Sequence, residues 1–252
     1  MNGKIRVFHR VPKAAIGFRP EHLDFKRGIR VGNLDENERI TRLLKLELEY
    51  RYQQEFVTER WGRGVYWVWI GFLPRANRAC MPISSSVSFG CSKFFIMVDA
   101  DDRLFKCGLQ IERGYVKAPR EYGHCELRPD WDWNRLLASL RRGGPMEHEL
   151  RRLVGREGFR VHAGGWSEGA KDLTRSNLPG VARIRQMLAD APAADWAGFQ
   201  LYYPMKEKEV LSTTGVDLLE SMLAIFDEVR PLMNLCMHVQ LPPPMKPQMD
   251  TD

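Results

Sequence analysis

The chain has 252 residues, 44% of them hydrophobic and 28% charged, which is the composition of a globular protein with a sizeable core. Its 38 Lys and Arg residues against 32 Asp and Glu give a formal charge of +6, which favours anionic partners. Five cysteines without a Cys-x-x-Cys pair argue against a disulfide framework and a zinc site, and no apolar run is long enough for a membrane span, so we expect a cytoplasmic protein that uses no cofactor.

The N-terminal half predicts a strand, a long helix and a second strand. Residues 4 to 11 alternate apolar with basic side chains, as a half-exposed strand does. From residue 36 to about residue 60 the apolar side chains recur every four residues, which predicts a long helix; they are Ile40, Leu44, Leu48, Tyr52 and Phe56. Residues 65 to 73 are aromatic, β-branched and few, so we expect a central strand there.

Residues 93 to 113 predict an antiparallel hairpin with a tight connection at Asp101 and Asp102. On its second strand, one face is apolar and comprises Phe105, Cys107, Leu109 and Ile111. The other face carries Lys106, Gln110 and Glu112, and the alternation predicts that this face is turned to water.

The C-terminal half predicts mainly helices. We expect helices at about 131 to 141, 146 to 155, 181 to 191 and 215 to 230, the last ending before Pro231. Strands are expected at 158 to 164 and 199 to 205, with Pro204 marking a strand end or an edge.

This order of elements lacks the regular alternation of a doubly wound sheet. We therefore expect an α+β fold with a mainly antiparallel sheet, a long helix in the N-terminal half and a helical C-terminal half. Residues 1 to 238 form one domain in this interpretation, residues 114 to 130 could mark a sub-boundary, and residues 239 to 252 form a Pro-rich tail.

One motif suggests a serine hydrolase. The sequence GWSEG, at residues 165 to 169, fits the nucleophile-elbow pattern, and Asp217 or Asp227 followed by His238 would complete a Ser167, Asp and His order. Few strands are predicted between Ser167 and His238, so the simpler interpretation of this motif is a glycine-rich loop.

A metal-dependent nuclease is the second enzyme reading. Divalent metal needs clustered oxygen ligands, and a lysine can stabilise developing charge; Asp99, Glu112 and Lys106 are the available residues. The Asp/Glu-x-Lys spacing of such sites is absent, which favours an ordinary strand face over a metal site.

The clustering of positive charge is the sequence feature that most favours one function, nucleic-acid binding. Seven arginines crowd between residues 135 and 160, namely Arg135, Arg141, Arg142, Arg151, Arg152, Arg156 and Arg160. We expect Arg141, Arg142, Arg151 and Arg152 to contact nucleic-acid phosphates, with Trp131 and Trp133 stacking on bases. The alternative is a solvated helix face with both tryptophans in the core.

The run KFFIMVDADDRLFKCGLQIERG, followed by helices, a strand and a final helix ending in EVRPLMNLC, resembles a family of conserved hypothetical bacterial proteins that share a domain of unknown function. The resemblance covers about residues 40 to 238. That family's Arg-Phe-Ser and Lys-x-Pro-Tyr-Lys elements have no counterpart in residues 72 to 89. The resemblance therefore implies an α+β bacterial domain and carries over no site residue.

These observations favour a cytoplasmic binding or accessory protein without its own catalysis, with nucleic acid as the first candidate partner. Two other classes stay open. One is an enzyme, either of the two described above, and the other is a protein-interaction subunit that uses its aromatic surface.

Overall fold

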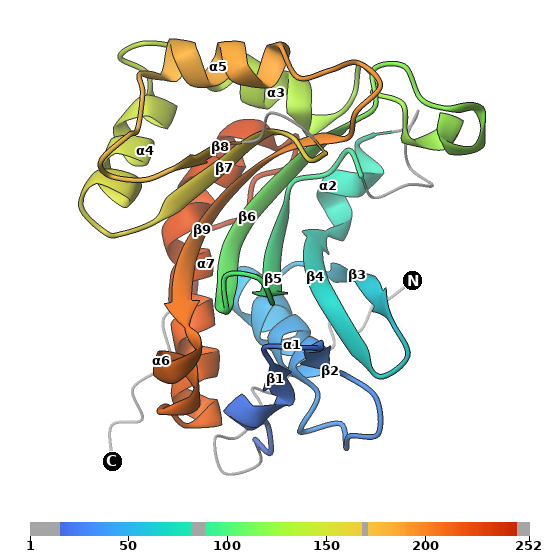
Figure 1. The fold of residues 1–252 in the computed structure, drawn as a ribbon, viewed down its shortest axis with the longest axis vertical. Coiled ribbons are helices and arrows are strands. Elements are labelled where there is room, and N and C mark those ends of the chain that lie inside the picture. Colours follow the sequence, from blue (N-terminus) through green and yellow to red (C-terminus); the bar gives the residue numbers. More distant parts are fainter. Residues whose placement is uncertain (1–15, 82–88, 168–170, 246–252) are drawn as a thin grey trace, which may run out of the picture.

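A computed structural model describes residues 16–81, 89–167 and 171–245 of the chain. The strand expected at residues 4 to 11 and the end of the Pro-rich tail lie outside these ranges. Figure 1 shows a curved sheet with helices behind it and at one end.

In the described ranges the sheet has nine strands, and every pairing between them is antiparallel. The order is β1-β2-β4-β5-β6-β9-β7-β8, and β3 pairs with β4 beside this path. The strands are β1 (Leu23–Asp24), β2 (Gly28–Arg30), β3 (Phe56–Arg63), β4 (Tyr66–Pro74), β5 (Lys93–Asp99), β6 (Leu104–Gly114), β7 (Arg160–Gly165), β8 (Lys171–Leu173) and β9 (Ala197–Lys206).

Helices alternate irregularly with these strands, so the α+β class is confirmed. The α-helices are α1 (Ile40–Tyr52), α2 (Arg75–Ala79), α3 (Asp132–Ser139), α4 (Pro145–Gly155), α5 (Val181–Ala189), α6 (Glu207–Leu211) and α7 (Gly215–Cys236). The described residues also form two short 3-10 helices, η2 (Pro20–His22) and η3 (Arg120–Cys125).

One hydrophobic core lies between the sheet and its helices. It takes apolar side chains from α1, α3, α4, α5 and α7 and from one face of β4, β5, β6, β7 and β9. At its centre the rings of Phe94 and Phe226 stack at 4.7 Å, and Tyr52 lies 5.9 Å from Phe94. The Tyr52 hydroxyl also donates a hydrogen bond of 2.6 Å to Asp227, which joins α1 to α7. The helices therefore share one face of the sheet and leave the other for a different set of side chains.

The first helix is shorter than its pattern predicts. It ends at Tyr52, where Gln53 adopts a left-handed conformation with φ 49°, and the chain then enters β3 at Phe56. Phe56 packs against Tyr52 at 6.2 Å, so the apolar stripe continues across the helix end and conceals it. The expected long helix over residues 36 to 60 is therefore wrong in its length.

The last helix is longer than expected. It continues through Pro231 to Cys236, although proline donates no backbone hydrogen bond. The buried side chains Leu232, Met233 and Cys236 hold this final segment against the core. Burial thus outweighs the local cost of the proline.

The other elements lie close to their expected positions. The hairpin is β5 and β6, the central aromatic strand is β4, and the helices expected at 131 to 141, 146 to 155 and 181 to 191 are α3, α4 and α5. Pro204 lies in β9 opposite Lys106, beyond Tyr202, the last residue of β9 that pairs with β7. Its position therefore fits the expectation of an edge.

Candidate functional site

The expected arginine cluster lies on the helical end of the molecule. Figure 1 shows α3, α4 and α5 together there, next to the ends of β7 and β8. Arg141 and Arg142 occupy the connection between α3 and α4, and both are exposed. Arg151 is exposed on α4 and pairs with Glu147 at 3.0 Å. Three of the four expected arginines therefore face solvent at one end of the fold.

Arg152 has a structural role instead. Its guanidinium group pairs with Glu149 at 2.9 Å and with Glu228 at 2.8 Å, and the second contact joins α4 to α7. These two carboxylates raise the pKa of Arg152 despite the opposing effect of burial. Because its charge is compensated twice, Arg152 is the least suited of the four to contact a phosphate.

Both tryptophans are buried, so the expectation that they stack on bases is not met in this structure. Trp131 is 0% and Trp133 1% exposed, and both belong to the core between α3, α7 and the sheet. The Trp131 ring lies so close to Gly90 and Gly114 that a Cβ atom on either would clash with it or press against it. This close fit and the burial of Trp133 agree with the alternative interpretation, in which both tryptophans belong to the core.

Further cations lie at the same end: Arg135 belongs to the arginine cluster seen in the sequence, whereas Arg183 and Arg185 were not expected to contribute. Arg135 is exposed on α3, and Arg183 and Arg185 are exposed on α5, which packs against α3. In the described part of the chain, none of these three forms an ion pair with a carboxylate. The sequence signal that could have indicated these cations was the position of Arg183 and Arg185 on the polar side of the helix expected at 181 to 191.

A small cavity lies beside these cations. Its volume is about 170 Å³, and it is lined by Gly165, Lys171, Arg183, Met187, Asp190, Ala191 and Pro192. Asp190 accepts a hydrogen bond of 2.6 Å from the Gln186 amide, whereas Lys171 and Arg183 have no carboxylate partner among the residues with assigned positions. Lys171 therefore adds one further positive charge beside Arg183, while Asp190 brings a carboxylate to the same lining.

The second face of the sheet carries a row of polar side chains in cross-strand register. The row runs over five strands as Asp172, His162, Gln200, Gln110 and Lys93. Gln110 accepts hydrogen bonds from the Trp69 indole at 2.9 Å and from Gln200 at 2.7 Å, and His162 contacts Asp172 at 2.9 Å. Most of these groups are thus satisfied by their neighbours on the same face.

Lys93 is the most buried charge on this face. Its side chain is 0% exposed, and its Nζ lies 2.6 Å from Glu112 and 2.9 Å from Glu59. Burial alone would lower the pKa of Lys93, but the two carboxylates outweigh burial and raise it. Burial raises the pKa of Glu112, although Lys93 opposes the shift. This compact ion-pair cluster stabilises the junction of β3, β5 and β6 and has no free group for catalysis.

The expectation that Lys106, Gln110 and Glu112 face water is wrong. They lie on the face opposite the helices, as the alternation predicts, but all three are buried. Lys106 pairs with Asp99 at 2.6 Å near the turn, and Glu112 pairs with Lys93 at the other end of the hairpin. Asp99 and Glu112 therefore do not converge, and no group of three or more metal-ligating side chains occurs in the described ranges.

The residues expected for a serine hydrolase also lie apart. The Ser167 backbone N–H faces the Asp195 carboxylate, whereas His238 Nε2 lies 3.0 Å from the Asp130 carbonyl oxygen. Asp227 is bound by Tyr52 and Arg51. Asp217, the other candidate, belongs to the N-terminal cap of α7 through Thr214.

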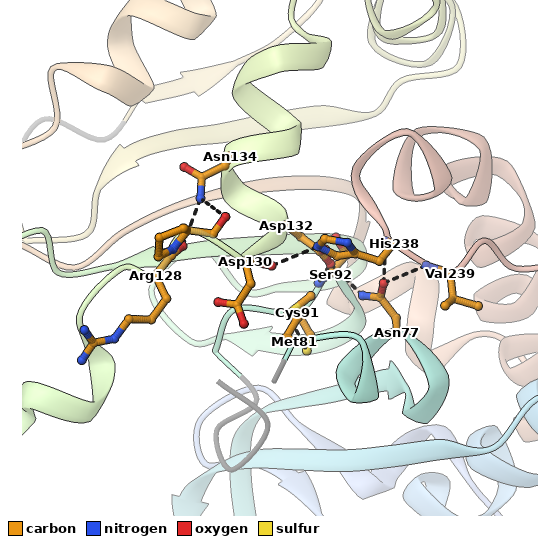
Figure 2. Close-up of polar contacts among 11 residues, drawn as sticks. Asn77, Met81, Cys91, Ser92, Arg128, Asp130, Asp132, Asn134, His238 and Val239 are labelled. Atoms are coloured by element: carbon orange, nitrogen blue, oxygen red, sulfur yellow. Dashed lines mark hydrogen bonds and ion pairs between the residues drawn. The ribbon is translucent and has the colours of Figure 1, made fainter. Parts of the chain in front are cut away.

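His238 belongs instead to a polar cluster around Asp132, shown in Figure 2. Asp132 Oδ2 accepts hydrogen bonds from the Ser92 backbone N–H at 2.6 Å and from the Asn77 amide at 2.8 Å. The other oxygen, Oδ1, lies 3.9 Å from His238 Nε2 and has no hydrogen-bond partner in the part of the chain described. Burial raises the pKa of Asp132 to about 6.

This cluster is structural. Asn77 Oδ1 accepts hydrogen bonds from the backbone N–H groups of His238 and Val239, so it holds the chain after α7 against α2. The adjacent Cys91 thiol is fully buried, and burial raises its pKa to about 12, which leaves it protonated and unreactive near neutral pH. The cluster joins α2, α3, β5 and the C-terminal segment and offers no accessible nucleophile.

Comparison of the chain with known protein families, characterised proteins and solved structures found no match. The helices with assigned positions are too short or too polar to cross a membrane. The candidate site is therefore defined by the geometry of this chain alone.

Proposed function

We propose that the protein binds nucleic acid by contacting the phosphate backbone with its helical end, and that it reads no base sequence there. The observation that supports this most is the set of exposed arginines on α3, on α5 and between α3 and α4 that form no ion pair with a carboxylate of the described residues. They are Arg135, Arg141, Arg142, Arg183 and Arg185.

Electrostatics explains why such a surface binds a polyanion. Each phosphate that a cation neutralises releases condensed counterions, and this entropy gain supplies affinity that does not depend on sequence. Lys171 and Arg183 beside the cavity extend the same positive surface towards β8. A protein with a formal charge of only +6 over 252 residues thus has a group of neighbouring cations at its helical end.

The burial of the two tryptophans limits the kind of nucleic acid that we expect to bind. Trp131 and Trp133 are in the core, so they provide no stacking platform for unpaired bases. The affinity would then come from contacts between the arginines and the phosphate backbone of the nucleic acid alone. We therefore expect similar affinity for unrelated duplex sequences and no strong preference for single strands.

Charge reversal tests the proposal directly. We expect Arg142→Glu combined with Arg185→Glu to weaken binding to labelled duplexes of unrelated sequence by the same factor. The slope of log affinity against log salt should become shallower by roughly 0.9 for each lost phosphate contact. Fluorescence anisotropy between low and physiological salt measures both quantities.

A matched control separates a local contact from net charge. Lys26→Glu combined with Arg42→Glu makes the same change in charge at exposed positions near β1 and on α1, away from the helical end. This control should retain most of the binding. Equal losses in the two variants, or no binding of the folded parent protein at low salt, would contradict the proposal.

A further inference from the structure

Among the described strands, β3 forms a long edge of the sheet that no other strand covers, with a bulge at Trp61 and Gly62. The path of the sheet ends in β1, with two residues, and in β8, with three, and such short strands offer little backbone to an added chain. In contrast, β3 has eight residues, contains no proline, and pairs only with β4 among the described strands. The edge of β3 therefore lacks two of the devices that natural sheets use against strand addition.

The backbone groups that face this edge can be identified. The Phe56 N–H donates a hydrogen bond of 3.0 Å to the Glu49 carboxylate and so points away from β4. Its partner across the ladder is Pro74, which has no N–H, in agreement with a pair that exchanges no backbone hydrogen bonds. Since the direction alternates along a strand, Thr58 and Arg60 also turn their N–H and C=O groups outward.

The side chains on the exposed half of β3 suit a protein interface. Trp61 is 72% exposed, the highest value among the large apolar side chains of the described residues. Arg60 and Arg63 flank it, and the Arg60 guanidinium lies 3.9 Å over the Trp67 ring, which positions it beside the strand. Tryptophan and arginine are the residue types most enriched among the energetic centres of interfaces.

Charge determines the kind of partner. Glu59, the acidic residue of β3, is turned to Lys93 in the buried ion-pair cluster, so it does not offset the arginines at the edge. Arg60 and Arg63 form no ion pair with a carboxylate in the described part of the chain. An approaching segment with acidic side chains would complement them.

We propose that the free edge of β3 binds an extended, acidic segment of a partner protein, which adds to the sheet as a further strand. Backbone hydrogen bonds to Thr58 and Arg60 would supply the pairing, Trp61 the apolar contact, and Arg60 and Arg63 the preference for acidic side chains. The β3–β4 hairpin lies away from α3 and α5 (Figure 1), so this interaction is separate from the nucleic-acid surface.

Hydrogen exchange tests the geometry without a known partner. In the protein alone, the amides of Thr58 and Arg60 should exchange much faster than those of Val57 and Glu59, which face β4. Slow exchange at Thr58 and Arg60 at concentrations where the protein is monomeric would mean that the edge is already covered, and would overturn the proposal.

A synthetic peptide then tests the partner chemistry. The probe alternates valine with glutamate over seven residues and carries blocked termini. It should bind and slow exchange at Thr58 and Arg60, whereas the same peptide with lysine for glutamate, or with N-methylated valines, should bind at least roughly tenfold more weakly. Equal binding of the acidic and basic peptides would overturn the charge argument.

Variants locate the contact. Trp61→Ser and Arg63→Glu should each weaken the acidic peptide roughly tenfold or more, while Trp166→Ser, at another exposed tryptophan, should leave it unchanged. The folded state of each variant is checked by its unfolding midpoint. If the edge instead forms a concentration-dependent dimer that Trp61→Ser abolishes, the occupant is a second copy of this chain, and the proposal of an acidic partner is wrong.

Discussion

Replacing Asp132 by asparagine should remove a pH-dependent loss of stability. The folded pKa of Asp132 is about 6, against an ordinary value of 3.8. Below pH 3.8 both the folded and unfolded states are protonated; between about pH 4 and 6 only the unfolded state ionises, which lowers the free energy of unfolding. At 1.36 kcal/mol for each unit, the ionised carboxyl costs about 3 kcal/mol at pH 7.

An asparagine keeps the shape and one acceptor oxygen but cannot ionise. Its oxygen can accept the same hydrogen bonds from Ser92 and Asn77. Its NH₂ group would replace Oδ1, which has no hydrogen-bond partner in the described structure. We therefore expect Asp132→Asn to be more stable than the parent at pH 7 by up to about 3 kcal/mol and to show no advantage at pH 4.

Urea unfolding followed by tryptophan fluorescence from pH 4 to pH 7.5 measures this difference. Other carboxyls, such as Asp99, have lowered pKa values, so their contribution to the stability of the protein is lost as the pH falls. This contribution is the same in variant and parent, so the difference between the two proteins reports the effect of Asp132. The exposed Asp102→Asn serves as the control and should follow the parent at every pH. A destabilised Asp132→Asn protein that keeps the parent's pH profile would refute the reasoning.

Three further predictions follow from the packing. Lys93→Met should destabilise by about 3 to 5 kcal/mol in urea unfolding because it leaves Glu112 buried without its partner, and adding Glu112→Met should restore part of the loss; no restoration would count against the ion-pair account. Gly114→Ala, with φ 65° and a Cβ position 2.3 Å from a carbonyl oxygen, should lower the unfolding free energy by at least about 1 kcal/mol, whereas Gly123→Ala, with open space around it, should stay within about 0.5 kcal/mol; equal effects would show that the close contact is absent. A thiol reagent should modify Cys80 rapidly and spare the four buried cysteines until the protein unfolds, and a second fast thiol in the native protein would be the contrary result.

The local sequence pattern predicted a helix or strand correctly wherever the residues of that segment alone determine its secondary structure. The hairpin of β5 and β6 follows from strict alternation and a tight turn, and α5 follows from its apolar spacing. The end of α1 did not follow, because Phe56 continues the helical spacing while belonging to a strand. Phe56 packs against Phe94, which lies next to it only in the folded chain, so the local pattern could not distinguish strand from helix at that residue.

The candidate site was predicted in part, for a similar reason. Arg141 and Arg142 lie in a polar connection, and local sequence is enough to expect them at the surface. The burial of Trp131 depends on Gly90 and Gly114, which make room for its ring from distant positions in the sequence. Lys93 is buried because Glu59 meets it from a strand that the sequence pattern assigned to a helix.

The position of β9 in the sheet has a consequence for synthesis of the chain. This strand lies between β6 and β7, so it arrives after both of the strands it joins. Until residue 206 has left the ribosome, β6 has an open edge, and its apolar face has no covering from α7 until residue 236 has followed. Pairing of segments so far apart in sequence is slow, and open edges favour association between nascent chains. The sheet is therefore completed in one late step, and a chain released before Lys206 would lack the strand that holds its two parts together.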